Sequence, residues 1–575
     1  MRRPKTAGFF KRAFTAGLLA VIILLPAPPP AFASPESGSI QADRYGDYLS
    51  ARVAIINRDT QAAADFYIRA VASDPFNVAL IHQAFSLAVA SGRHDDAARL
   101  ARRLATLDDK STGLMELVLL VDDLRQEKLD TARTRIVDMP RTGIVALMAP
   151  LVSSWLDAWN GDFGAALADL EELEGNRGFE PFQKTHRAYI LDYAGQVEEA
   201  RQAYVEAVAL QKGRDLRLVL AFSRFLHRHG ETAAANEVLD AYTQAYPSNV
   251  LVEATRKDFE SGATLAPVVN SVADGAAEAF FNTGQALANE RSSTSAVIYL
   301  RLALALKSDF SVAALLLGDV LERDGRLETA LEAYMMVSDH PVLGWDARFE
   351  AATLKARMDR PDDAIMVLET MAAERPTNTN LLSTLADILR GENRFEEAIG
   401  YYDRVVALVD QPAPRHWTLF YARGIALERK GAWERAEADF LKALELKPDQ
   451  PLVLNYLGYS WVEKGVNLDR ALMMIERAVE QRPDDGYIVD SLGWALYRTG
   501  KYEEAAAWLE KAVILRPEDP TINDHLGDAY WKVGRQLEAT FQWRHALTMD
   551  PEGDDHERIR EKIRYGLDSE QRSQN

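Results

Sequence analysis

Small and apolar residues recur with a period of about 34 positions along the C-terminal third of the chain. Four prolines set this spacing, and glycines and alanines between them keep the same register. The positions are Pro448, Pro483, Pro517 and Pro551, then Gly424, Gly458, Gly493 and Gly527, then Ala436, Ala471, Ala505 and Ala539. A fixed period of this length is typical of proteins in which each repeat is one supersecondary unit.

Within one period, the pattern predicts two short helices that pack against each other. Leu492 and Leu496 lie four positions apart, on one face of a first helix. Gly500 ends that helix because glycine tolerates the left-handed conformation found there. Gly493 and Ala505 are small where the two helices must approach closely. Such a hairpin cannot bury its apolar faces alone, so neighbouring hairpins must stack.

The same register extends upstream and predicts an all-α fold, an α-α superhelix of about 14 helical-hairpin repeats. Residues 34–249 are expected to form an N-terminal arm of about six repeats, and residues 277–553 a C-terminal arm of about eight. The register breaks at 250–276, which indicates either a connector between two arms or a longer irregular repeat in one continuous superhelix. Residues 554–575 are expected to form a polar capping helix followed by a disordered tail.

The repeat pattern resembles the tetratricopeptide repeat family, most specifically in the last four units. The resemblance implies that the first helix of each unit lines a concave groove in which partner proteins or peptides bind. It places the following candidate partner-binding residues in that groove: Asn455, Tyr459, Tyr487, Asp490, Trp494, Tyr497, Arg498, Asp524, Asp528, Trp531 and Lys532.

Aromatic residues among these candidates admit two interpretations. Aromatic side chains beside aspartate and arginine are typical of a groove that holds an amphipathic peptide. In the competing interpretation, the superhelix buries the aromatic residues against its next turn or against the capping segment. Trp461 and Trp543 are different, because their positions in the repeat predict that both are core residues.

The first 33 residues have the organisation of a signal peptide. Five cationic residues and no acidic ones precede or flank an apolar run at 13–25, and Ala31-Phe32-Ala33 forms an A-x-A cleavage site. We expect cleavage near Ala33 and export to the periplasm as a soluble chain without an integral membrane span. An uncleaved anchor is the alternative, although the apolar run is shorter than the roughly 20 residues of a spanning helix.

Charge and composition narrow the function further. The chain has 66 Lys+Arg and 86 Asp+Glu, a net charge of −20, which becomes −25 when the five cations of the predicted signal peptide are removed. This charge disfavours nucleic acid as a partner. Cys is absent, which excludes disulfides, thiolate metal sites and thioether lipid anchors.

No catalytic, cofactor-binding or metal-binding motif is present. The ten histidines do not form a metal-ligand spacing, and the chain lacks nucleotide-binding and nucleophile motifs. The acidic pairs lie at turns or helix starts, where helix capping explains them. We therefore expect a non-enzymatic protein with no cofactor.

Residues 415–551 also resemble a group of exported repeat proteins from Gram-negative bacteria. Some of these are lipoprotein adaptors that gather a periplasmic carboxyl-terminal processing protease and its cell-wall hydrolase substrates. This chain lacks the lipobox cysteine of those proteins, so an adaptor role would belong to a soluble periplasmic protein or one held at the membrane by a partner. The alternative is an assembly or structural factor for the biogenesis or export of an envelope polymer, polysaccharide or peptidoglycan.

Overall fold

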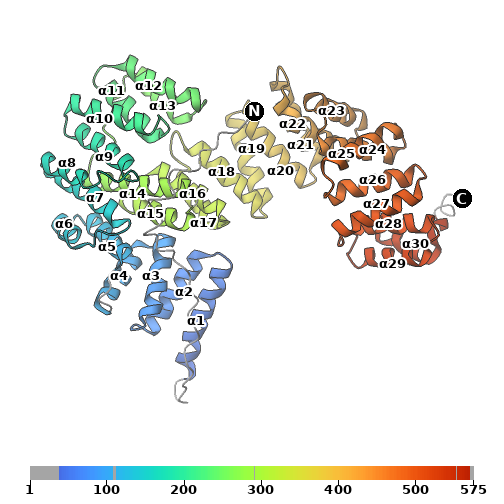
Figure 1. Ribbon diagram of the computed structural model, residues 1–575, viewed down its shortest axis with the longest axis horizontal. Helices are drawn as coiled ribbons and strands as arrows, with labels where there is room; N and C mark the ends of the chain where they lie inside the picture. The colour runs from blue at the N-terminus through green and yellow to red at the C-terminus, as the bar shows by residue number, and fades with distance from the viewer. Residues whose placement is uncertain (1–37, 108–111, 291, 552, 554, 570–575) are drawn as a thin grey trace. The chain divides into compact units, whose positions relative to one another are not determined.

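The computed structural model describes residues 38–107, 112–290, 292–551, 553 and 555–569. The predicted signal peptide and the last six residues lie outside this part of the chain. Within it the fold is all-α, as the sequence predicts, and the helices follow one another in short antiparallel pairs (Figure 1).

The first half of the chain contains α1 (Gly38–Ile56), α2 (Thr60–Ser73), α3 (Val78–Ser91), α4 (His94–Leu107), α5 (Gly113–Arg125), α6 (Leu129–Asp138), α7 (Val145–Trp159), α8 (Phe163–Glu171), α9 (Glu180–Tyr193), α10 (Val197–Leu210), α11 (Leu216–Arg228), α12 (Thr232–Ala245), α13 (Val250–Ser261), α14 (Val272–Asn289) and α15 (Ser293–Leu306). The second half contains α16 (Ser311–Arg323), α17 (Leu327–Met335), α18 (Gly344–Arg357), α19 (Pro361–Glu374), α20 (Thr379–Gly391), α21 (Phe395–Leu408), η1 (Pro414–His416), α22 (Trp417–Arg429), α23 (Trp433–Leu446), α24 (Pro451–Lys464), α25 (Leu468–Gln481), α26 (Gly486–Arg498), α27 (Tyr502–Leu515), α28 (Pro520–Lys532), α29 (Gln536–Leu547), α30 (Asp555–Tyr565) and η2 (Gly566–Ser569).

In chain order these helices give six pairs from α1 to α12 and eight from α14 to α29, which confirms the predicted 14 repeats. Only α13 and α30 stand outside the pairs in the described part of the chain. The small residues act as predicted: a Cβ at Gly493 would overlap the side chain of Leu509, and one at Gly527 would overlap Trp543. Gly500 ends α26 with a φ of +83°.

The chain divides into two compact units, the first ending at Asp359 and the second beginning at Arg360. The division falls between α18 and α19, so the predicted connector at 250–276 lies inside the first unit. There it forms α13, a stretch without regular structure, and the start of α14. The division of the chain into arms at 34–249 and 277–553 stays a prediction.

Within the first unit, the helices that follow the predicted connector turn back onto the earlier repeats. Helix α14 packs on α7 and also contacts α5 and α9, while α15 packs on α3 and α5. All of these partners are first helices of their hairpins, and Figure 1 shows α14 and α15 beside them. The layer that the repeat family uses as a groove is therefore part of the core here.

Close packing and a buried ion pair hold α14 in place. Gly275 lies directly on the ring of Trp155, where a Cβ would overlap the indole. The indole Nε1 of Trp155 donates to Nδ1 of His186 at 2.9 Å. Arg217 of α11 donates to Glu278 of α14, whose side chain is only 1% exposed. Thr283 of α14 also contacts Met148 of α7, which lies 135 positions earlier in the chain.

Candidate functional site

Three consecutive first helices of the second unit carry all the predicted groove residues. Helix α24 carries Asn455 and Tyr459, α26 carries Tyr487, Asp490, Trp494, Tyr497 and Arg498, and α28 carries Asp524, Asp528, Trp531 and Lys532. These helices contact each other in order, α24 with α26 and α26 with α28. The repeat therefore brings the residues onto neighbouring helices, as expected from their positions.

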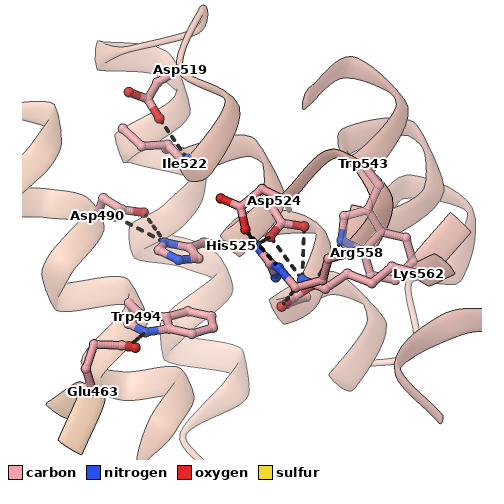
Figure 2. Close-up of polar contacts among 12 residues, drawn as sticks. Glu463, Asp490, Trp494, Asp519, Ile522, Asp524, His525, Trp543, Arg558 and Lys562 are labelled. Carbon is pink, nitrogen blue, oxygen red and sulfur yellow. Dashed lines mark hydrogen bonds and ion pairs between the residues drawn. The ribbon is translucent and has the colours of Figure 1, made fainter. Parts of the chain in front are cut away.

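Trp494 is the centre of a series of contacts that we call the aromatic ladder, made of Glu463, Trp494, Tyr497, Arg498 and His525. The Nε1 of Trp494 donates to Oε1 of Glu463 at 2.5 Å (Figure 2). Nη1 of Arg498 donates to the same oxygen at 3.1 Å. The indole stacks on His525 with 3.9 Å between ring centroids and on Tyr497 with 4.8 Å. The ladder thus links α24, α26 and α28.

His525 also contacts a buried carboxylate on the preceding first helix. Its Nδ1 lies 3.0 Å from Oδ1 of Asp490, and both side chains are buried. Burial alone would lower the pKa of His525, but the charge and hydrogen bond of Asp490, with Asp524 and Asp528 nearby, raise it above its ordinary value. The raised pKa favours the protonated ring, which can pair with Asp490 as a cation.

Asp524 and Asp528 bind a lysine from the C-terminal helix. Lys562 of α30 is 1% exposed, and its Nζ lies 2.9 Å from Oδ2 of Asp524 and 2.7 Å from Oδ2 of Asp528. Arg558, one turn earlier, pairs with Asp524 at 2.9 Å, and Nε1 of Trp543 donates to Asp528 at 2.9 Å (Figure 2). We call Asp524, Asp528, Arg558 and Lys562 the cap cluster.

Burial changes the protonation of the cap cluster. The pKa of Asp528 is raised to about 6, mainly by desolvation and in part by the neighbouring Asp524, against the opposing effect of the Lys562 charge. Two carboxylates that share one lysine are therefore not both fully charged below neutral pH.

Trp531 contacts the same C-terminal segment. Its ring lies against Gly566, where a Cβ would overlap the indole, and its centroid is 5.4 Å from that of Trp543. Three predicted groove residues, Asp524, Asp528 and Trp531, thus contact residues after position 555. For Trp531, this contact is the one described by the second interpretation of the aromatic residues, in which they lie against the capping segment.

The remaining predicted residues differ in exposure. Tyr487, Arg498 and Lys532 are exposed, and Arg516 lies over the ring of Tyr487 with 4.9 Å from its Cζ to the centroid. Asn455 and Tyr459 are half-buried, and Oδ1 of Asn455 is buried with no hydrogen bond from the described residues. Burial, then the charges of Glu463 and Asp490, raise the pKa of Tyr459, so its hydroxyl stays protonated.

Sequence reasoning did not single out His525, Arg558 or Lys562. The i, i+4 spacing of the two cations in the predicted capping helix was the available signal. Trp461 and Trp543 are both buried, as their repeat positions predict.

The described residues contain no group of three or more His, Asp or Glu side chains arranged to hold a metal ion. Of the described helices, none combines the length and apolarity needed to cross a bilayer. The chemistry of this surface is that of stacking, hydrogen bonding and ion pairing, which suits binding.

Comparison with known sequences identifies the repeats. Tetratricopeptide repeat profiles match residues 349–411 and 383–451, and a further one matches 493–534. The chain is 28% identical over 227 residues to the TPR repeat-containing protein PA4667 of Pseudomonas aeruginosa. That alignment spans 40% of this chain and only 32% of the relative.

Solved structures of similar shape match shorter stretches. A tetratricopeptide repeat protein from Parabacteroides merdae covers 45% of this chain and 98% of its own length, with 18% identity and a TM-score of 0.37. MamA from Desulfovibrio magneticus covers 30% of this chain and 94% of its own, with 23% identity and a TM-score of 0.27. YrrB, described as a TPR protein with an unusual peptide-binding site, covers 34% and 97%, with 21% identity and a TM-score of 0.27.

The repeat period, the paired helices and the sequence profiles agree with one another. Stacked hairpins of this kind form extended surfaces on which other proteins bind. Residues 349–451 and 493–534 are therefore tetratricopeptide repeats, and such repeats imply a protein-interaction scaffold.

Proposed function

We propose that this chain is a non-enzymatic scaffold of the periplasm that binds protein partners along α24, α26 and α28. The finer role that we propose is that of an adaptor, which brings a processing protease together with cell-envelope substrates. The proposal of this role rests on the resemblance of residues 415–551 to exported adaptor proteins.

The proposal rests on the exposed residues of α26 and α28. Tyr487 is 52% exposed, and Arg498 and Lys532 extend from neighbouring first helices into solvent. An exposed tyrosine with a cation over its ring, here Arg516, can stack on a partner's side chain, while the exposed cations of the helices pair with its carboxylates. The half-buried Trp494 behind them is held by Glu463, so the surface is already ordered before a partner arrives.

A photocrosslinking amino acid at Tyr487 or Lys532 tests this surface in cells. We expect both positions to give the same adduct of one protein partner. Ile514, which is 79% exposed on α27, is the matched control because it lies on a second helix and should give no such adduct. An adduct that forms equally from Ile514, or none from either test position, would contradict the proposal.

Export is a separate part of the proposal and rests on the sequence of residues 1–33. Fusion of a reporter enzyme that folds only in an oxidising compartment, after residue 40, should give activity that is lost when Arg2, Arg3 and Lys5 are changed to glutamate. Reporter activity that survives this change, or never appears, would argue against export. N-terminal sequencing of the purified chain tests cleavage at Ala33.

A role with envelope polymers is the second candidate, and the exposed ring of Tyr487 is the observation that favours it, since sugars stack on such rings. Sedimentation with purified peptidoglycan measures this binding. We expect loss of co-sedimentation with Tyr487→Ala if the polymer is the ligand, and no co-sedimentation of the unmodified chain if the ligand is a protein.

A further inference from the structure

One buried arginine of the first unit lacks an anionic partner. Arg301 of α15 is 9% exposed, and its Nε and Nη2 are buried without a hydrogen bond from any described residue. Its guanidinium lies on the backbone of Gly92, where a Cβ would be 3.1 Å from Nη1. A buried cation without a partner is unfavourable. Nε and Nη2 of Arg301 are therefore donors that could bind an acceptor.

A second arginine with free donors lies nearby. Nη1 of Arg326 donates to Oγ1 of Thr60 at 3.1 Å, and its Nε is 3.5 Å from Oδ2 of Asp324 without forming a hydrogen bond. Its Nη2 is buried with no partner among the described residues. The side chain is 12% exposed.

Hydrogen bonds connect the surroundings of the two arginines. Nε2 of Gln61, adjacent to Thr60, donates to the carbonyl of Ser91 at 3.3 Å and lies 3.4 Å from Oε2 of Glu332. Ser91 precedes the Gly92 that contacts Arg301. Elements α2 and α3 on one side and α15 and α17 on the other thus converge on the two guanidinium groups.

Three cations, Arg58, Arg301 and Arg326, lie among these contacts with two carboxylates, Asp324 and Glu332. Glu332 forms no ion pair with Arg301. Asp324 pairs with Arg326, and the backbone carbonyl of Asp324 accepts a hydrogen bond of 2.6 Å from Arg58. Burial, and then the charge of Arg326, lower the pKa of Arg301 to about 10 even though Glu332 opposes this. Arg301 therefore remains a cation at neutral pH.

Two cavities lie beside residues that contact the two arginines. One of about 310 Å³ is lined by Gly92, Arg93, His94, Asp95, Asp96 and Arg125. Its carboxylates are already paired, Asp95 with Arg125 at 2.8 Å and Asp96 with Arg93 at 2.9 Å. The other, of about 340 Å³, is lined by Ala288, Ser293, Val320, Arg323 and Asp324.

Each cavity includes a residue that touches one of the two arginines. Gly92 contacts Arg301, and Asp324 contacts Arg326. Both cavities therefore lie next to the proposed site.

We propose that Arg301 and Arg326 form a binding site for a small oxyanion, the phosphate or carboxylate group of a ligand. A planar guanidinium can donate two parallel hydrogen bonds to such a group. The bound anion would supply the acceptors that Nε and Nη2 of Arg301 lack. It would also fix α2 and α3 to α15 and α17.

Thermal unfolding and calorimetric titration of the purified full chain test this site. Inorganic phosphate and acetate are the two probes, with potassium chloride at equal ionic strength as the control for screening. We expect phosphate or acetate, but not chloride, to raise the melting temperature, and the stronger of the two to identify the ligand group. Arg301→Met should weaken that binding by about tenfold or more.

Further variants separate binding from stability. Without added anion, Arg301→Met should melt at the same or a higher temperature, because it removes an unpaired buried charge. Arg323→Met, in the wall of the second cavity, should keep the response, and Glu332→Gln should strengthen it by removing the competing carboxylate. No response to either probe, or an equal response in Arg301→Met, would overturn the proposal.

Discussion

The first helices of the repeats serve different purposes in the two compact units. In the first unit, the first helices α3, α5, α7 and α9 contact α14 or α15, so their inner surface is part of the core. In the second unit, the first helices α24, α26 and α28 carry the aromatic ladder, and α30 packs against the last hairpin. The sequence of the added helix explains the difference: α14 presents Gly275, Ala276 and Phe280, which fill space against other helices, whereas α30 is predominantly charged.

Helices α14 and α30 each form a buried ion pair with a first helix. Each places a charged side chain that is 1% exposed against opposite charge on a first helix, Glu278 against Arg217 and Lys562 against Asp524 and Asp528. A buried ion pair adds little net stability, but it penalises every position of the helix in which the pair is not formed. We infer that these pairs fix the register in which α14 and α30 dock.

The largest effect that distinguishes the units should come from Trp155→Ala. Loss of this buried ring removes the surface on which Gly275 packs and should cost about 3–5 kcal/mol. Trp543→Ala is the matched control, because Trp543 is equally buried but belongs to the last hairpin of the second unit. Hydrogen exchange after each substitution should show α14 exposed only by the first and α28 only by the second. If Trp155→Ala left the protection of α14 unchanged, the first unit would not depend on this contact.

Lys562→Ala should have the next largest effect, confined to the second unit. It leaves Asp524 and Asp528 buried without their cation and should cost roughly 3 kcal/mol, partly relieved when Asp528 takes up a proton. Hydrogen exchange and proteolysis at 555–569 would report the release of α30.

A triple variant checks the electrostatic origin of that effect. Adding Asp524→Asn and Asp528→Asn to Lys562→Met removes all three charges, so most of the stability should return. A triple variant as unstable as Lys562→Ala would mean that packing, not charge, holds α30.

The sequence predicts the repeats well because each hairpin depends on nearby residues. Gly493 and Leu509 are 16 positions apart, and the same spacing joins Gly284 to Leu300 and Gly527 to Trp543, so the period identifies such contacts. The docking of α14 is different, since Arg217 and Glu278 are 61 positions apart and neither belongs to the repeat pattern. No periodic signal marks such a pair, and residues 250–276 therefore looked only like a break.

The candidate site was predictable to the same extent. Repeat positions correctly placed Asp490, Trp494 and Asp524 on adjacent first helices. They could not show that Asp490 pairs with His525, or that Asp524 pairs with Lys562, because partner side chains at those positions vary from repeat to repeat. Burial of these carboxylates follows from single residues and not from the period.

The stability of the cap cluster should decrease as pH rises, which is the reverse of most carboxylate pairs. Asp528 has a folded pKa of about 6 against 3.8 unfolded, so the folded state binds more protons between these values and loses stability as pH rises through them. His525 adds to this trend, because its raised pKa gives stability that is present below pH 6.5 and lost as pH rises through the folded value.

Amide exchange at 559–565, corrected for intrinsic rates, measures this dependence. We expect protection of α30 to be greater at pH 5 than at pH 8, by on the order of 1–3 kcal/mol. Asp528→Asn should flatten the change between pH 4 and 6. Protection that increases with pH would show that the carboxylates are held in their charged form by Lys562 and Arg558.

The smallest effect should come from Arg498→Ala, and its comparison with Arg217→Ala tests the contrast between the units most directly. Arg498 is exposed and pairs with the exposed Glu463, so its loss should cost less than about 1 kcal/mol. Arg217→Ala instead leaves Glu278 buried without a cation and should cost roughly 3 kcal/mol or more. Urea unfolding of both variants gives the two values. Equal costs in the free energy of unfolding would mean that the first helices of the second unit are as much a part of a core as those of the first. A small cost for Arg498→Ala together with loss of the Tyr487 adduct would assign Arg498 to partner binding.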